Sequence, residues 1–265
     1  MPFTVSHAAI AAPLARRGLI LSAVVAGSMA PDFQYFLTLS VDDRGWHVFP
    51  GLFLYALPAA LIALWVFHRV LKRPLVRILP ENHRIRLAKV DADFPFLPLR
   101  RFALIVASTL VGLLTHVGLD AFTHRDGIVV ELLPVFRTHV LANSLVTLAL
   151  CDLLQDIGTV LLSVVLVAQY WRWFRAQPVA GRAGLAQFFD VRREWPFLVA
   201  FSAAAGVAAL ILAHSCGPNP RNPQAFRSLG EYVLVAAMAL LAVELTVFSL
   251  ILDRFVFRPA RDKKP

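Results

Sequence analysis

Long apolar runs separated by polar segments set the pattern of this chain. Each run is close to the length that a helix needs to cross a hydrocarbon core of about 30 Å. The five runs are residues 51–67, 102–122, about 153–171, 196–214 and 232–252. Such runs are typical of membrane helices, which satisfy their own backbone hydrogen bonds. The pattern predicts an all-α fold, a polytopic transmembrane helical bundle of about five full spans, as a single domain over residues 1–265.

Two shorter apolar pieces, residues 5–15 and 18–30, precede these spans. At 1.5 Å per residue each gives about 16 to 20 Å of helix, which is too short to cross the membrane comfortably. A proline directly after the second piece ends it, because helices seldom continue into the residue before proline. We favour a pair of short helices that forms a re-entrant hairpin and returns Asp32 to the level of His7. The alternative is one kinked span from about residue 14 to 39, which leaves His7 on the cytoplasmic side.

Two segments between the spans are expected to hold short helices. Residues 69–101 contain four prolines, so we expect irregular structure with one surface helix at about 81–90. Residues 139–151 are apolar but too short to cross alone. We expect a partly buried outer helix there, at about 139–150.

Basic residues give the chain a formal net charge of +9, and 19 of its 26 lysines and arginines lie in three segments. These are residues 69–101, residues 172–193 and the tail from Arg254 to Lys264. The five proposed spans place all three on one side, which the positive-inside rule makes cytoplasmic. We therefore expect a multi-pass protein of the cytoplasmic (inner) membrane, with a cytoplasmic C-terminus and the lipid bilayer as its partner. Nothing in the sequence resembles an aromatic-interleaved nucleic-acid surface.

The segment from Thr115 to His124 places two histidines and an aspartate at four-residue intervals where an apolar run ends. This spacing puts His116, Asp120 and His124 on one helical face. His116 and Asp120 are one turn apart, so both can reach a single ion. His124 is two turns from His116, about 12 Å along the axis, which is too far for a third ligand of that ion. We expect His124 to serve a second metal, a phosphate or a substrate hydroxyl.

Further polar residues fall on the same predicted side of the membrane. They are Asp32, His47, Asp152, Gln155 and Asp156, joined by His7 if the N-terminal hairpin forms. Ionisable side chains in a membrane are costly unless they pair, bind an ion or line a wet cavity. Mixed His and carboxylate ligands suit Zn²⁺, Mn²⁺ or Fe²⁺, and we expect a divalent metal ion, Zn²⁺ before the others. The alternative is a polar cluster that only joins neighbouring helices through hydrogen bonds.

Three motifs resemble those of a bacterial family of uncharacterised integral membrane proteins. They are the opening Met1–His7, the segment Gly27–Phe36 with its Pro-Asp pair, and Gly112–Asp120 followed by Thr123-His124 and Gly127. That family is similar to the membrane-bound predicted metal-dependent hydrolases, in which a first-helix His, a Pro-Asp after the second helix and a G-x3-H-x3-D-x2-T motif recur. The resemblance covers roughly residues 1–160, and residues 161–265 add transmembrane helices without a recognised motif.

The resemblance implies a set of four metal ligands: His7, Asp32, His116 and Asp120. His47 sits where the related hydrolases carry a loop rich in His, Arg and Thr, but the Thr-His-Ser that usually follows is missing here. We therefore place His47 around the metal ligands, together with Asp152 and Asp156. Leu154-Gln155 matches a Leu-Gln element of the family, so Gln155 is expected to contact the substrate or to support a ligand. We group Gln155 with His124 as a candidate catalytic residue.

These expectations favour a membrane-embedded metal-dependent hydrolase that acts on a phosphoester or lipid-linked substrate at the outer face of a bacterial inner membrane. His124 is the candidate general acid, since an ordinary His pKa near 6.5 suits proton transfer at neutral pH. Asp152 and Asp156 either flank the metal or bind outer-loop amides. The sequence leaves the oligomeric state open, and two other functions as well. One is a transporter in which Glu244, Asp152 and Asp156 form an ion path, and the other is a non-catalytic membrane partner protein.

Overall fold

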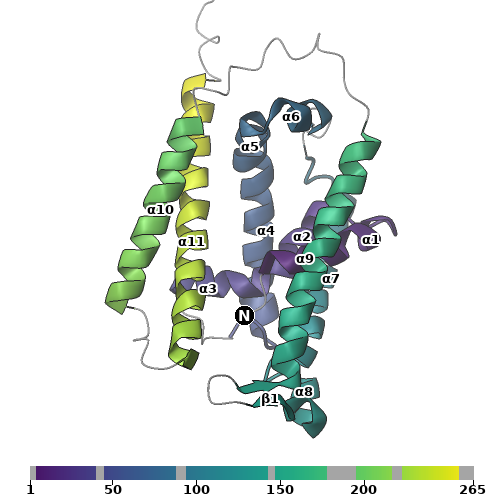
Figure 1. The fold of residues 1–265 in the computed structure, drawn as a ribbon. Coiled ribbons are helices and arrows are strands. Elements are labelled where there is room, and N and C mark those ends of the chain that lie inside the picture. The colour runs from purple at the N-terminus through teal and green to yellow at the C-terminus, as the bar shows by residue number, and fades with distance from the viewer. Residues whose placement is uncertain are drawn as a thin grey trace, which may run out of the picture.

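Helices make up most of this protein in the computed structural model (Figure 1), which describes residues 4–39, 45–87, 94–142, 147–177, 195–216 and 223–256. Within these ranges four helical segments are long and apolar enough to cross a membrane. They are Leu52–Val76, Leu99–Leu132, Leu150–Ala176 and Ser228–Ile251. The fourth predicted span, residues 196–214, corresponds to helix α10 (Trp195–Cys216), whose apolar part Val199–Ser215 is shorter than the four candidate spans. The helical membrane architecture is confirmed, while the count of five spans stays a prediction.

The N-terminal segment forms two short helical pieces that fold back on each other. The 3₁₀ helix η1 (Thr4–Ile10) and α1 (Ala11–Ala15) make the first piece, and α2 (Leu21–Met29) makes the second. Gly18 between them has a φ of 96°, a left-handed conformation that costs glycine little. Both η1 and α1 pack against α2. The predicted pair of short helices is therefore present, with a turn where the alternative requires one kinked span.

The end of α2 leads directly to the first candidate ligand. The 3₁₀ turn η2 (Ala30–Asp32) and helix α3 (Phe33–Thr38) follow α2 without a loop. The Thr4 hydroxyl donates a hydrogen bond to Asp32 Oδ2 at 2.6 Å. This contact brings the start of η1 to the end of the N-terminal unit.

One nearly continuous helical rod comes next, with a wide π turn before each of its two prolines. It consists of the π turn η3 (Leu52–Ala56), α4 (Leu57–Val66), the π turn η4 (Phe67–Leu71) and α5 (Lys72–Ile78). Proline lacks a backbone N–H, and its ring clashes with the carbonyl four residues earlier. For Pro58 and Pro74 these carbonyls belong to residues within η3 and η4, so the π turns lie where the backbone must widen.

A short surface helix then lies at one end of the bundle. Helix α6 (Glu81–Leu87) confirms the helix predicted at about 81–90. His83 of α6 contacts the hydroxyl of Tyr170 near the end of α9 (Leu150–Ala176). Helix α6 and the C-terminal end of α9 therefore lie at one end of the molecule (Figure 1).

The other end of the bundle holds α8 and a small β-hairpin. Helix α7 (Leu99–Thr123) leads to α8 (Ile128–Leu132), the 3₁₀ turn η6 (Pro134–Arg137) and strands β1 (His139–Ala142) and β2 (Thr147–Ala149). The two strands pair antiparallel. The outer helix predicted at about 139–150 is therefore wrong. Periodicity does not separate a short apolar run in a strand from one in a helix, and the Asn143-Ser144 pair in this run is typical of a turn sequence.

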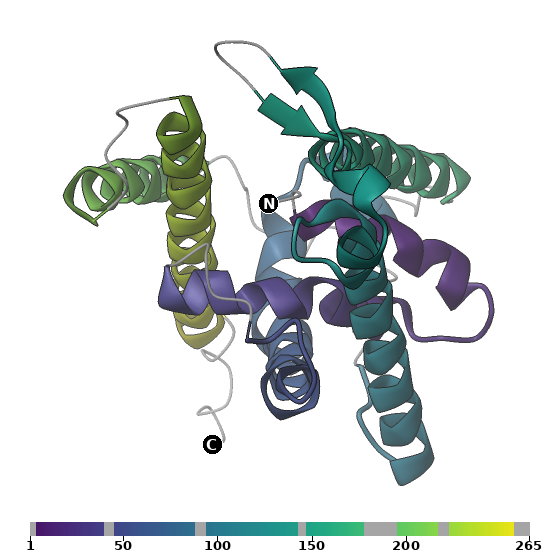
Figure 2. The ribbon, with the colours of Figure 1, turned by 90° about the horizontal axis from the view of Figure 1, so that it is seen from below.

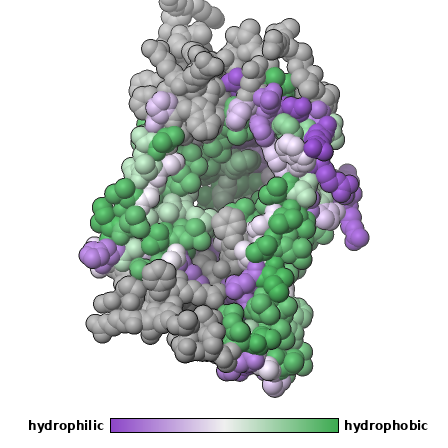
Figure 3. Space-filling view, in the orientation of Figure 1, coloured by the Kyte–Doolittle hydropathy of each residue, from purple (hydrophilic) through white to green (hydrophobic). Residues whose placement is uncertain are grey.

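Helices α10 and α11 (Pro223–Val256) pack against each other at one side of the molecule (Figure 2). Helix α11 also contacts α3, η4 and α5. Large apolar side chains remain exposed along the long helices, such as Val164 on α9 and Val243 on α11. Hydrophobic atoms make up much of the described surface in Figure 3. Contiguous apolar surface of this kind marks contact with a membrane or a partner, and helices of this length favour the membrane.

Small residues let α2 and α7 approach each other at backbone distance. A Cβ atom added to Gly27 would lie 2.1 Å from a backbone carbonyl oxygen of α7, and one added to Gly112 would lie 2.3 Å from a backbone carbonyl oxygen of α2. Ala23 and Ser108 precede the two glycines by one turn, so both helices carry a small-xxx-small pattern. The crossing holds the end of α2 beside the second half of α7.

We expect Gly112→Ala to destabilise the protein, because the added methyl group forces α2 and α7 apart. Overpacking of this kind costs about 1–3 kcal/mol. Thermal unfolding in detergent measures the effect as a lower midpoint. Gly118→Ala on the same helix is the matched control, since a Cβ there meets no atom within 4 Å. Equal midpoints for the two variants would contradict the role of the crossing.

Candidate metal centre

Five buried His and Asp side chains from four parts of the chain meet near the C-terminal end of α7. His7 comes from η1, Asp32 from η2, His47 from the turn before α4, and His116 and Asp120 from α7. Each is at most 9% exposed. The structure thus brings together the four ligands that the resemblance implies, and it adds His47.

His116 is oriented by a hydrogen bond to the end of α2. Its Nδ1 lies 2.8 Å from the carbonyl oxygen of Ser28. A carbonyl oxygen only accepts hydrogen bonds, so Nδ1 carries the proton and donates it. In the neutral ring, Nε2 then presents its lone pair to the cluster. An imidazole fixed in this way through its other nitrogen is the usual arrangement of a metal-binding histidine.

Four acceptor atoms, one of them His116 Nε2 itself, lie at the spacing of metal ligands. Asp32 Oδ1, His47 Nε2 and His116 Nε2 form a triangle with sides of 3.2, 3.3 and 3.6 Å. His47 Nε2, His116 Nε2 and Asp120 Oδ2 form a second triangle with sides of 3.3, 3.2 and 3.7 Å. The centre of each triangle lies about 2.0 Å from its three corners, close to the ligand distance of Zn²⁺.

The second oxygen of Asp120 faces away from these triangles, toward two more histidines. His7 Nε2 lies 4.0 Å from Asp120 Oδ1, and His124 Nδ1 lies 3.4 Å from it. The His7 ring also stacks on that of His116, with 4.1 Å between their centroids. These distances place His47 closer than His7 to the centre of the triangles, while the ligand atoms of His7, His116 and Asp120 also lie within 4.8 Å of one another.

His124 lies beside Asp120, as its spacing of four residues predicts. Helix α7 ends at Thr123, and His124 has an extended backbone with φ −108° and ψ 142°. Its Nδ1 lies 3.4 Å from the outward oxygen of Asp120. His124 belongs to neither triangle, so it stays a candidate for the substrate or proton-transfer role.

The position of His47 depends on contacts that no motif shows. The Gln34 side-chain oxygen on α3 accepts a hydrogen bond from the Trp46 backbone N–H at 2.8 Å. A Cβ added to Gly51 would lie 1.8 Å from the Gly45 carbonyl oxygen, so this turn closes tightly on itself. Both features hold the turn that carries His47 against α3. The only trace of this contact in the sequence is a glutamine twelve residues before Trp46.

Two cluster residues outside the candidate spans have shifted pKa values. Burial, and next to it the imidazole of His116, lower the pKa of His7 to about 4, so His7 is neutral at pH 7. For Asp32, burial alone would raise the pKa, but His116 and the hydrogen bonds from His47 and Thr4 lower it below its ordinary value. Asp32 is therefore ionised at neutral pH, and both residues are in the protonation state that a metal ligand needs.

Several buried polar atoms of the cluster have no hydrogen-bond partner among the described residues. They are both ring nitrogens of His7, Nδ1 of His47 and Oδ1 of Asp120. Buried polar atoms without a partner are rare in native proteins. Their concentration here makes the cluster a candidate binding site.

The other candidate residues lie around the cluster or elsewhere. Asp152 accepts two hydrogen bonds from the Arg125 guanidinium, at 3.1 and 2.6 Å, and one from the Ala149 N–H at 3.0 Å. Asp152 therefore joins Arg125 to the first turn of α9. Gln155 is buried in the first part of α9, and Asp156 is exposed one turn after Asp152.

Residues 1–251 match the family model described as Domain of unknown function (DUF4184). The chain belongs to this family. No curated protein and no solved structure matches the DUF4184 chain. The chemistry of its cluster therefore has to be argued from the cluster's own geometry.

We expect Asp152→Ala to weaken the start of α9 without changing the metal content. Losing a side-chain acceptor in the first turn of a helix costs about 0.5–2 kcal/mol. Thermal unfolding measures the loss, and elemental analysis of the purified protein measures the metal. Asp156→Ala is the matched control, and we expect a smaller effect from it because its side chain is exposed. Loss of metal from Asp152→Ala would instead place this carboxylate in the centre.

Proposed function

We propose that this DUF4184 protein binds a divalent metal ion, Zn²⁺ before Mn²⁺ or Fe²⁺, and uses it to hydrolyse a phosphoester. Asp32, His47, His116 and Asp120 would hold the ion, and His7 would complete its surroundings. The pair of triangles around His116 carries the proposal, since both have the spacing of ligands that share one ion.

The donor set fits this choice of metal. Two imidazole nitrogens and two carboxylate oxygens suit Zn²⁺, Mn²⁺ and Fe²⁺, whereas Mg²⁺ and Ca²⁺ prefer oxygen alone. Two ionised carboxylates with neutral imidazoles also leave a buried charge of about −2, which a divalent cation balances. The unpartnered nitrogens of His7 and the free oxygen of Asp120 offer further contacts at the edge of the same site.

When bound, such an ion acts as a Lewis acid and lowers the pKa of a coordinated water to about 7. The remaining roles belong to the chain. His124 borders the outward oxygen of Asp120 at 3.4 Å and is placed to donate a proton to a leaving oxygen. Gln155, buried in the adjacent part of α9, would contact the substrate.

The location of the cluster favours a substrate at the membrane surface. Its residues lie at the end of α7 that leads to α8 and the hairpin, opposite α6 (Figure 1). With the basic residues of the α6 end on the cytoplasmic side, this end faces outward, and the N-terminal pair of helices forms a re-entrant hairpin beneath it. A lipid-linked phosphoester of a bacterial inner membrane fits such a site.

The transporter hypothesis has weaker support from the geometry. It requires Glu244, Asp152 and Asp156 to form a path, yet Asp152 is engaged by Arg125 and by a backbone amide. Glu244 is half-buried in α11, and its Oε2 has no hydrogen-bond partner among the described residues. A single unpartnered oxygen is equally consistent with a structural role for Glu244.

Removal of a ligand should abolish metal binding. We expect wild-type protein to purify with close to one ion per chain, and His116→Ala and His47→Ala each to weaken binding by more than about 100-fold. This exceeds the 10- to 100-fold loss typical of residues that only orient ligands. Elemental analysis and titration with Zn²⁺ in detergent give the content and the affinity.

His139→Ala is the control, because this histidine is exposed on β1. His7→Ala should lose less metal than His47→Ala, since His7 lies outside both triangles, with its Nε2 4.0 Å from Asp120 Oδ1. Equal metal in all variants would refute the site. A larger loss for His7 than for His47 would favour the ligand set that the resemblance implies over the one that the distances favour.

Hydrolysis should need both the metal and His124. We expect cleavage of bis(p-nitrophenyl) phosphate to stop after chelation and to return with Zn²⁺. His124→Ala should keep its metal but lower kcat by about 10²–10⁴-fold, the usual contribution of a general acid. It should also flatten one limb of the pH–rate profile. Metal binding without any phosphoesterase activity would leave the metal site standing and remove the proposed reaction.

A further inference from the structure

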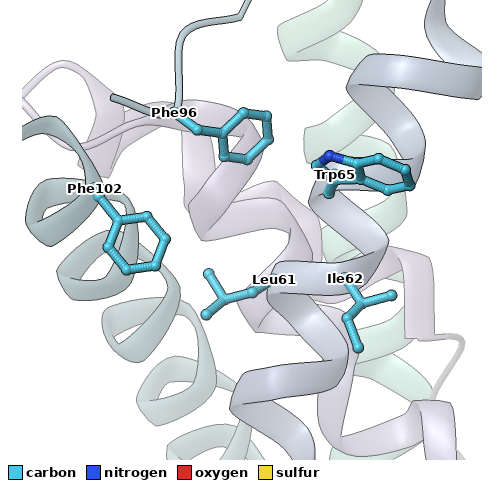
Figure 4. A pocket seen from close by; sticks show the side chains of 5 residues that line it. All are labelled: Leu61, Ile62, Trp65, Phe96 and Phe102. Atoms are coloured by element: carbon cyan, nitrogen blue, oxygen red, sulfur yellow. The ribbon is translucent and has the colours of Figure 1, made fainter. Parts of the chain in front are cut away.

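A second site lies at the opposite end of the molecule, in a groove between α4 and α7. The groove has a volume of about 240 Å³, and all of its lining is apolar (Figure 4). Its walls are Leu61, Ile62 and Trp65 of α4, Phe102 of α7, and Phe96 of the segment that precedes α7. Four of the five lie within candidate membrane spans, so the groove opens at the level of the lipid tails.

Two arginines lie at the rim of this groove on aromatic rings. The guanidinium of Arg69 is 5.9 Å from the centroid of Phe96, which is itself a groove wall. Arg101, the neighbour of Phe102, lies 5.2 Å over Phe94. Phe94 and Phe96 contact each other edge to face, with 5.0 Å between centroids. One aromatic cluster therefore positions both positive charges above one apolar groove.

Arg101 is also held through the backbone. Its Nε donates a hydrogen bond to the Pro95 carbonyl oxygen at 2.6 Å. Both guanidiniums are thus oriented before any ligand binds, which lowers the conformational entropy lost on binding.

We propose that this groove binds an anionic phospholipid, with one acyl chain against the α4 and α7 walls and the phosphate between Arg69 and Arg101. Charge complementarity selects this occupant. A zwitterionic lipid carries an ammonium group beside its phosphate and so balances the two guanidiniums less well, and a soluble anion leaves the apolar groove empty. A basic pocket between membrane helices is a recurrent headgroup site. The site shares no residue with the metal cluster and does not depend on the proposed hydrolase activity.

Lipid retention tests the proposal. The full chain is reconstituted in vesicles of equal parts phosphatidylglycerol and phosphatidylcholine, extracted in mild detergent, and its bound lipids are counted by native mass spectrometry. We expect wild-type protein to retain phosphatidylglycerol over phosphatidylcholine by about tenfold or more. Arg69→Gln and Arg101→Gln should each reduce this preference about fivefold, the contribution of one basic residue at an anionic membrane surface.

Arg175→Gln is the matched control. It removes the same charge from an arginine that stacks on an aromatic ring, with Arg175 5.0 Å over Trp171, but on α9, which lines no part of the groove. Ile62→Trp should reduce retention of both lipids, because this position is 63% exposed and a larger side chain there fills the groove.

Three results would each overturn the proposal. They are equal retention of the two lipids by wild-type protein, an equal loss in Arg175→Gln, and an unchanged total in Ile62→Trp. Folding is monitored by thermal unfolding of every variant. Arg69→Gln keeps the test valid if the Arg101 variant does not fold, because Arg69 is exposed, whereas Arg101 binds the Pro95 carbonyl.

Discussion

The close crossing of α2 and α7 is the constraint on which the metal cluster depends. Gly27 and Gly112 let the two backbones touch, and the residue after Gly27 is Ser28, whose carbonyl holds His116 Nδ1 one turn beyond Gly112. The same short helix ends in the turn that carries Asp32. Two ligands that are 84 residues apart in sequence are thus placed by one backbone contact. A wider crossing would move the Ser28 carbonyl and Asp32 away from His116 together, because α2 and η2 are continuous.

The electrostatics of the cluster explain why a cation is the natural occupant. His116 Nε2, His47 Nε2 and two carboxylate oxygens approach within 3.2–3.7 Å, and each of these atoms carries a lone pair. A proton on a ring nitrogen can bridge such a contact, but the proton of the neutral His116 ring is on Nδ1, which donates it to the Ser28 carbonyl. Hydrogen bonds reach neither the His7 nitrogens nor Asp120 Oδ1 among the described residues. One divalent ion balances both carboxylates and accepts the lone pairs of neutral imidazoles.

Much of the membrane fold follows from apolar run length, and much of the cluster from helical spacing. His116 and Asp120 share a face because they are one turn apart, and the short N-terminal pieces return Thr4 to Asp32. His47 was underestimated because its place depends on Gln34 and on a tight glycine turn, neither of which has a period. The β-hairpin was taken for a helix because its apolar run is too short to reveal a period. His124 contacts Asp120 because the two are one turn apart in sequence, although α7 ends at Thr123.

The position of the cluster along α7 limits what the protein can do with it. Asp120 is three residues from the helix end, about 5 Å along the axis, where water and headgroups reach the chain. Charged ligands cost less there than near the middle of a span, and a polar substrate can arrive without crossing the apolar layer. Glu244 has no such position, because it lies well inside α11. The metal cluster therefore lies near one end of α7, apart from the apolar groove with Arg69 and Arg101. This separation suits two independent sites, one for chemistry and one for lipid binding, better than a path between them.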